Sequence, residues 1–186
     1  TWGERAEYIR DGLDIKVFER NLDYFMRNTT AQVTFMITFN IFSVTTFQTL
    51  LEKMLEWRAK YNDTNSGRWQ RIHFDTPYLK EPLQYDINIL PKEEYMPYME
   101  THLQFIKDNV QEGSKQHFTD LEYEKFRRVV DYMKSTEYSD GKVAEGRKDF
   151  WNFFNEQDRR RGNSFVDNFP EMNDFFQLCK DANGQG

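Results

Sequence analysis

The stretch QVTFMITFNIF at residues 32–42 decides the fold class of this 186-residue chain. Apolar side chains recur at every second position from Val33 to Ile41, with more polar ones between them. A period of two is typical of a β-strand and places alternate side chains on opposite faces. We therefore predict a strand here, with Thr34, Thr38 and Asn40 on its less apolar face.

Helical patterns lie on either side of this strand. Residues 14–27 repeat apolar side chains at spacings of three and four, and Asp14 is placed to cap the first turn. After the strand, Thr45 and Gln48 have the spacing of a capping box and open a second apolar stripe, which ends near Tyr61. The sequence therefore predicts one helix before the strand and one after it.

A second strand is predicted beyond a polar turn at residues 62–67. It covers about residues 69–76, where apolar side chains alternate with His73 and Asp75. Two strands joined by a helix of this length indicate a right-handed parallel crossover.

The second half of the chain is predicted to be mainly helical. Prolines punctuate a stretch that contains an extended candidate at residues 83–90, and helical stripes follow, one of them opened by a Thr119–Glu122 capping box. The fold class that we infer is α/β, a partial parallel (β/α) barrel fragment of two to three strands in residues 1–91. A mainly helical C-terminal extension in residues 92–186 follows it. Parallel sheets usually have more strands than this, so the α/β part is expected to be a piece of something larger.

Composition excludes several classes of protein. The chain has 25 basic and 31 acidic residues, a net charge of −6, which argues against a general nucleic-acid binder. It contains no apolar run near the length of about 20 residues that a membrane span needs. The single cysteine, Cys179, excludes an internal disulfide framework and any metal site made of cysteines alone. A cytoplasmic location is the default expectation.

The carboxyl ends of the two strands hold the best candidate site, because ligands of parallel α/β folds bind there. Asn40 and Ser43 end the first strand, and His73 and Asp75 share the less apolar face of the second. An amide, a hydroxyl and a carboxylate at one rim could hold a small polar ligand. A purely structural reading also stands, since Asn40 could cap the next helix and Asp75 could brace the Thr76-Pro77 turn.

The remaining candidates are weaker. His73, His102 and His117 show no paired metal-ligand spacing, so no metal site is predicted, and the last two are expected at the surface. Three arginines at residues 159–161 end a predicted helix, where cations favour the negative end of the dipole. A phosphate or nucleic-acid patch is the alternative reading of that run.

Three segments resemble the radical S-adenosylmethionine (radical SAM) enzymes. The opening GERAEYIRDG, residues 3–12, resembles the segment after the fourth barrel strand of that family. Residues 33–43 resemble the fifth strand and its exit. DRRRGNSF at residues 158–165, followed by FPEM at 169–172, resembles the tail of the subgroup with a twitch domain, common in phage and metagenomic sequences.

The resemblance implies a cofactor and a division of labour. In the family, a reduced [4Fe–4S] cluster cleaves S-adenosylmethionine (SAM) to a radical that takes a hydrogen atom from the substrate, while the protein positions and shields the reactive species. By position, Arg10 matches the arginine that meets the SAM carboxylate. Asn40 and Ser43 match positions near the adenosyl part. Asp75 and His73 would lie on the side of the substrate, a small molecule or a peptide.

The motif that defines the family is missing from this chain. Neither the Cys-x-x-x-Cys-x-x-Cys triad that holds the cluster nor the Gly-Gly-Glu strand motif is present. Both precede the matched region, so we expect a C-terminal fragment whose partner is the N-terminal half of the same protein. Alone it would hold neither the cluster nor, with Cys179 as its one cysteine, an auxiliary cluster, and it would be inactive.

A different class of function also fits the sequence. The aromatic-rich helical stripes of the second half could bury themselves against another protein. The alternative to the enzyme fragment is therefore a non-catalytic helical protein-interaction module.

Overall fold

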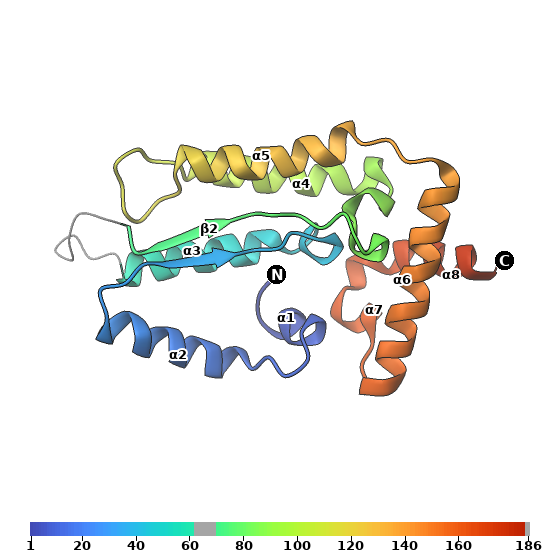
Figure 1. Ribbon diagram of the computed structural model, residues 1–186, viewed down its shortest axis with the longest axis horizontal. Coiled ribbons are helices and arrows are strands. Elements are labelled where there is room, and N and C mark those ends of the chain that lie inside the picture. The colour runs from blue at the N-terminus through green and yellow to red at the C-terminus, as the bar shows by residue number, and fades with distance from the viewer. Residues whose placement is uncertain (62–69, 185–186) are drawn as a thin grey trace.

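Helices make up most of the computed structural model, which describes residues 1–61 and 70–184 (Figure 1). Two short strands, β1 (Val33–Met36) and β2 (Ile72–Asp75), pair in parallel. The helices are α1 (Glu4–Ile9), α2 (Ile15–Asn28), α3 (Phe47–Tyr61), α4 (Lys92–Asp108), α5 (Asp120–Ser135), α6 (Asp140–Arg161), α7 (Phe165–Asn168) and α8 (Asn173–Gly184). Short 3-10 turns are η1 (Ile41–Ser43), η2 (Leu83–Tyr85), η3 (Ile87–Ile89) and η4 (Pro170–Met172). The expected mixture of helices with a small parallel sheet is confirmed.

Strand β1 is shorter than the alternation of residues 32–42 predicts. Its ladder ends at Met36, and one further bridge joins Phe39 to Tyr78 before the chain enters η1. Asn40 makes that turn, because its Oδ1 accepts the Phe42 N–H at 3.0 Å. A polar side chain that bonds nearby backbone competes with the sheet ladder, so the chain leaves the strand here.

The expected helices form, with one correction at a cap. Asp14 caps α2, and Thr119 with Glu122 forms the expected capping box of α5. Thr45 does not cap α3 with Gln48; its hydroxyl donates instead to Glu171 Oε1 at 2.8 Å. The predicted polar turn at residues 62–67 lies outside the described residues.

The extended segment predicted at residues 83–90 is wrong. The chain forms η2 and η3 there, and Asp86 links them by accepting the Asn88 N–H at 2.9 Å. The Asp86 carboxylate is fully buried and also accepts the hydroxyls of Tyr132 and Tyr138, at 2.7 and 2.6 Å. Local hydrogen bonding by a short polar residue again replaces an extended chain.

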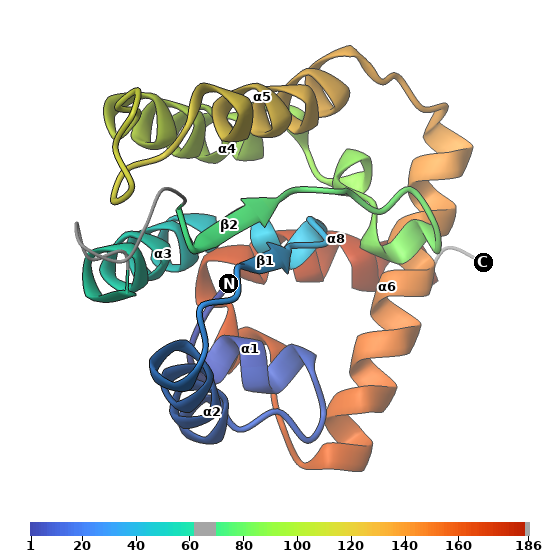
Figure 2. The ribbon, with the colours of Figure 1, turned by 60° about the vertical axis from the view of Figure 1, so that its left-hand side comes forward.

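The sheet lies between two pairs of helices (Figures 1 and 2). Helices α4 and α5 lie beyond β2, α1 and α2 lie beyond β1, and α6 crosses the end toward which both strands point. The more apolar sheet face packs on α3, where the Phe35 and Trp57 rings stack with centroids 5.1 Å apart. Arg71 ties α2 to the start of β2, since its guanidinium donates to the carbonyls of Met26 and Thr29.

Aromatic side chains join the two halves of the chain in one hydrophobic core. Phe42, just after β1, has its ring centroid 4.8 Å from that of Phe154 and 5.2 Å from that of Phe169. Helix α6 approaches η2 and η3 so closely that a Cβ on Gly146 would lie 2.6 Å from Ile89 Cγ2. Residues on both sides of position 91 therefore pack into a continuous core.

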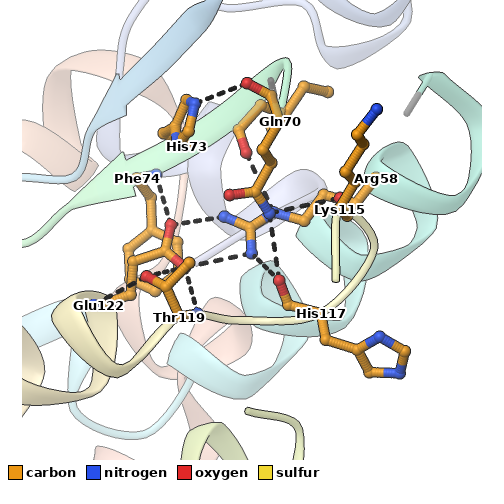
Figure 3. Close-up of polar contacts among 9 residues, drawn as sticks. Arg58, Gln70, His73, Phe74, Lys115, His117, Thr119 and Glu122 are labelled. Atoms are coloured by element: carbon orange, nitrogen blue, oxygen red, sulfur yellow. Dashed lines mark hydrogen bonds and ion pairs between the residues drawn. The ribbon is translucent and has the colours of Figure 1, made fainter. Parts of the chain in front are cut away.

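The outer edge of β2 is closed by two buried side chains (Figure 3). Arg58 of α3 donates from Nε to the Ile72 carbonyl at 3.1 Å, and Glu122 of α5 accepts the Phe74 N–H at 3.2 Å. The two side chains also pair with each other, and they are 0% and 5% exposed. The ion pair therefore provides the hydrogen bonds that a third strand would otherwise make along β2.

The outer edge of β1 has no such closure. The parallel register directs the peptide groups of Val33, Phe35 and Ile37 toward β2, as in the 2.8 Å bond from Ile37 N to Asp75 O. The alternate peptide groups, at residues 34, 36 and 38, therefore face away from β2. Within residues 1–61 and 70–184, the only hydrogen bond seen on them is one from Asn40 Nδ2 to the Thr38 carbonyl, at 3.1 Å.

Candidate functional site

A pocket runs along the open edge of β1, between this strand and the segment from α1 to α2. Its volume is about 480 Å³. It is lined by Thr1, Trp2, Ala6, Ile9, Arg10, Leu13, Ile15, Phe18, Phe35, Met36, Ile37, Thr38, Asn40, Ser43, Leu50 and Leu79. Most of these side chains are apolar, and a few polar groups join them. A mainly apolar cavity with a few polar groups is the usual form of a small-molecule site.

Arg10 is the cation of this pocket. It follows α1 directly, and its side chain is exposed. Among the described residues, its guanidinium has neither a hydrogen-bond partner nor a salt bridge to an acid. An unpaired guanidinium beside an apolar pocket can bind a carboxylate or a phosphate through two parallel hydrogen bonds.

Asn40 and Ser43 line the same pocket and also build the turn after β1. Ser43 Oγ accepts the Asn40 N–H at 3.3 Å, while the Asn40 amide donates to the Thr38 carbonyl at 3.1 Å. Asn40 therefore has the structural role that the sequence offered as an alternative, which is to cap the helical turn after the strand. One amide hydrogen, and the Ser43 hydroxyl hydrogen, remain available to a ligand.

His73 and Asp75 lie elsewhere, on the sheet face that points away from α3. Asp75 braces the following turn, since its Oδ1 accepts the Thr76 N–H at 2.8 Å. Its Oδ2 pairs with Lys125 Nζ of α5 at 2.8 Å. Neither His73 nor Asp75 lines the pocket at β1. The structure thus brings Arg10, Asn40 and Ser43 together but leaves the two expected substrate residues outside that pocket.

His73 is held by one hydrogen bond. Its Nε2 lies 2.7 Å from the Gln70 carbonyl, which can only accept, so Nε2 carries a proton. Among the described residues, no side chain is seen to bond Nδ1. This face therefore presents an imidazole nitrogen together with the Asp75–Lys125 ion pair.

Sequence reasoning missed Lys125 and the open edge. Lys125 is 50 positions from Asp75, and no local pattern marks that contact. The alternation of residues 32–42 predicts side-chain faces, but which strand edge stays free depends on the strand order. One of the two residues that close the outer edge of β2, Glu122, was already identified in the sequence, but only as a capping residue of a helix.

The other titratable candidates are structural. The expectation that His102 is exposed is wrong: it is 3% exposed, and its Nε2 donates to the Val44 carbonyl at 2.7 Å. Burial lowers the pKa of His102 to about 4. Cys179 is fully buried, and burial raises the pKa of its thiol well above the usual range. A buried, protonated thiol is a poor metal ligand.

The arginines at residues 159–161 end α6 as expected. Arg159 and Arg160 both pair with Glu156, at 2.7 and 2.6 Å, and Arg161 donates to the Tyr8 carbonyl at 2.6 Å. The two exposed arginines hold the pKa of Glu156 down to about 2. Their charge is already compensated in part, which disfavours a phosphate or nucleic-acid patch here.

The described residues contain no candidate metal site or membrane-spanning helix, and the chain matches no known protein significantly. Within residues 1–61 and 70–184, no group of three or more His, Cys, Asp or Glu side chains is placed to hold a metal ion. In the same ranges, no helix combines the length and apolar character needed to cross a bilayer. Family models, curated proteins and solved structures gave no significant match to the chain.

Proposed function

We propose that this chain is the C-terminal part of a radical SAM enzyme and that it supplies one side of the SAM pocket. The observation that carries the proposal is the pocket at β1. Arg10, Asn40 and Ser43 match cofactor positions by their place in the sequence, and all three line this one cavity. The lining of the cavity includes the end of β1 and the residues that follow it, from Phe35 to Ser43, and parallel α/β folds bind ligands at the carboxyl ends of their strands.

The residues of the pocket fit SAM. With respect to residues 1–61 and 70–184, the Arg10 guanidinium is free for a carboxylate, and the Ser43 hydroxyl and Asn40 amide each retain a hydrogen to donate. Trp2, Phe18 and Phe35 line the apolar part of the same cavity. When bound, SAM would supply the radical chemistry characteristic of this family.

The residues of this chain do not fit the iron–sulfur cluster. Four thiolates, or three with one open position, are needed, whereas the chain has one cysteine. That cysteine is buried in the core and holds its proton. The cluster must come from the N-terminal half of the protein, which we propose as the partner, so the chain alone is inactive.

The substrate would lie on the open sheet face of His73 and Asp75. Lys125 compensates the Asp75 charge and keeps two N–H donors for a ligand. The Nδ1 atom of His73 can form a hydrogen bond with a polar group of the substrate. Helix α5 thus brings a cation from the C-terminal half to the face where the sequence predicts the substrate.

The alternative is a non-catalytic interaction module, and Leu121 and Phe153, which are 62% and 43% exposed, are apolar groups that such a module could use. The stripes of the second half point into this chain's own core, where Tyr95, Phe126 and Phe154 are at most 3% exposed. Size-exclusion chromatography still separates the two readings, since the module would form a stable oligomer or complex.

Binding of SAM and of S-adenosylhomocysteine to the purified chain tests the proposal. We expect weak, saturable binding by calorimetry, and Arg10→Gln should weaken it about threefold to fivefold, as for an exposed ion pair. Arg20→Gln is the matched control, because Arg20 is an exposed arginine of α2 outside the pocket. No binding at millimolar ligand, or equal losses in both variants, would refute the cofactor assignment.

The upstream reading frame tests the missing half. We expect it to encode a Cys-x-x-x-Cys-x-x-Cys triad, and the extended protein to bind iron and sulfide after reconstitution. An extended protein without that triad would contradict the radical SAM assignment.

A further inference from the structure

The long wall of the pocket consists of backbone as well as side chains. Phe35, Met36, Ile37 and Thr38 line it in succession. In the register of the sheet, the N–H groups of Thr34, Met36 and Thr38 point away from β2, into the side where the pocket lies. Backbone donors and acceptors at this spacing match the peptide groups of an extended chain.

The opposite wall is suited to the side chains of such a chain. It is formed by Trp2, which precedes α1, by Ile9 of α1 and by Phe18 of α2. Trp2 and Phe18 pack edge to face with ring centroids 5.7 Å apart, so the wall is preorganised. A strand placed here would have apolar side chains on one side and the sheet edge on the other.

The exposure of β1 gives a second, independent indication. Met36 is 63% exposed, although strands of parallel sheets are normally covered on both faces. Fully parallel sheets of two strands are also uncommon. On the other side of the sheet, Arg58 and Glu122 occupy the edge of β2, so the sheet can grow only at β1.

We propose that the open edge of β1 accepts one further β-strand from a partner polypeptide, aligned parallel to β1. Its side chains would alternate, with the apolar ones against Trp2 and Phe18. Arg10, Asn40 and Ser43 are further lining residues of the same pocket. The inference rests on the proposed function in one respect, that the sheet is incomplete in this chain, and it does not require the ligand to be SAM.

The test uses the full chain and a synthetic probe strand. The probe is an eight-residue peptide of alternating valine and threonine, with a lysine at each end and blocked termini. Amide exchange is followed by NMR at millimolar peptide. We expect exchange at Thr34, Met36 and Thr38 to slow about tenfold, with no change at Ile37, whose amide already bonds Asp75. No protection, or protection at the β2 edge instead, overturns the proposal.

Two N-methylated probes separate strand pairing from simple apolar binding. Methyl groups on alternate amides block hydrogen bonds along one edge of the peptide only. A bound strand would bond β1 along only one of its two edges. We therefore expect the peptide methylated on that edge to give no protection of the β1 amides, and the peptide methylated on the other edge to protect them as the unmodified peptide does. Equal protection by both probes overturns strand addition.

A protein variant gives the complementary test. Met36→Pro removes an amide that β2 does not use and fills the edge with a ring, so the peptide should no longer bind. Met36→Ala, which keeps the amide, should bind as the parent chain does. SAM titration of the same samples keeps the two proposals apart: peptide binding without SAM binding refutes only the cofactor assignment, and the reverse result refutes only strand addition.

Discussion

The two edges of the small sheet carry the same kind of peptide groups, but they are treated differently. Along β2, Arg58 and Glu122 bond the Ile72 carbonyl and the Phe74 N–H from buried positions. Along β1, the corresponding groups of Thr34, Met36 and Thr38 face away from β2, and Met36 and Thr38 line a pocket. One edge is therefore closed by this chain's own side chains, and the other is the edge at which we propose that a further strand binds.

The difference shows which direction the sheet can extend. Unpaired strand edges are a liability that proteins cover with charges, bulges or helices. Here a buried ion pair, despite its desolvation penalty, covers one edge only. The sheet thus ends at β2, and β1 is the edge at which the proposed strand would extend it.

The largest effect is expected from opening the closed edge. Glu122→Leu leaves the Arg58 charge buried without its partner and the Phe74 N–H without an acceptor. We expect the free energy of unfolding to fall by about 3 to 5 kcal/mol, measured by urea denaturation. A loss below about 1 kcal/mol would show that the pair does not close the edge.

The double variant Arg58→Met with Glu122→Leu is the matched control. It removes both charges, so most of the loss should be recovered. A residual cost of about 1 to 3 kcal/mol is expected, because the Ile72 carbonyl and Phe74 N–H stay unbonded.

An intermediate effect is expected at the turn that follows β1, where His102 holds the Val44 carbonyl. Burial lowers the pKa of His102 to about 4, so the folded protein keeps this imidazole neutral while the unfolded chain protonates it near pH 6.5. The stability is present above pH 6.5 and is lost as the pH falls toward 4.

Between pH 7 and 4.5 this linkage amounts to about 2 to 3 kcal/mol. Thermal denaturation across that range measures it. His102→Gln should reduce the acid-induced loss of stability by the same amount, and an unchanged pH profile would exclude His102 as its source.

The smallest effect is expected on the open sheet face. Lys125→Met removes the ion pair with Asp75, whose two side chains are 25% and 32% exposed. Partly exposed pairs are screened by solvent, so we expect a loss of at most about 1 kcal/mol in urea denaturation. A larger loss would mean that this pair is structural and would weaken its assignment to the substrate side.

Local patterns predicted the elements of this fold well. The Asp14 cap and the Thr119–Glu122 box depend on neighbours in sequence, and both formed, whereas the alternation of residues 32–42 gave a strand only at Val33–Met36. The parallel pairing followed from the helix between the strands. The extended segment at residues 83–90 failed because Asp86 bonds its own neighbours and two distant tyrosines.

The candidate site combines two kinds of sequence signal. Asn40 and Ser43 were selected because they follow a strand and Arg10 because of the family resemblance, and all three line one pocket. Lys125 and the burial of His102 depend on packing between distant helices, which no local spacing encodes. The free edge of β1 depends on strand order, a property of the whole sheet.

Amide hydrogen exchange of the isolated chain tests the contrast between the edges most directly. The Phe74 N–H, bonded to buried Glu122, should exchange only with global unfolding, whereas the Met36 N–H should exchange at nearly the rate of an exposed loop. Equal protection of these two amides would show that β1 is already covered in this chain. That result would contradict the account of an open sheet edge.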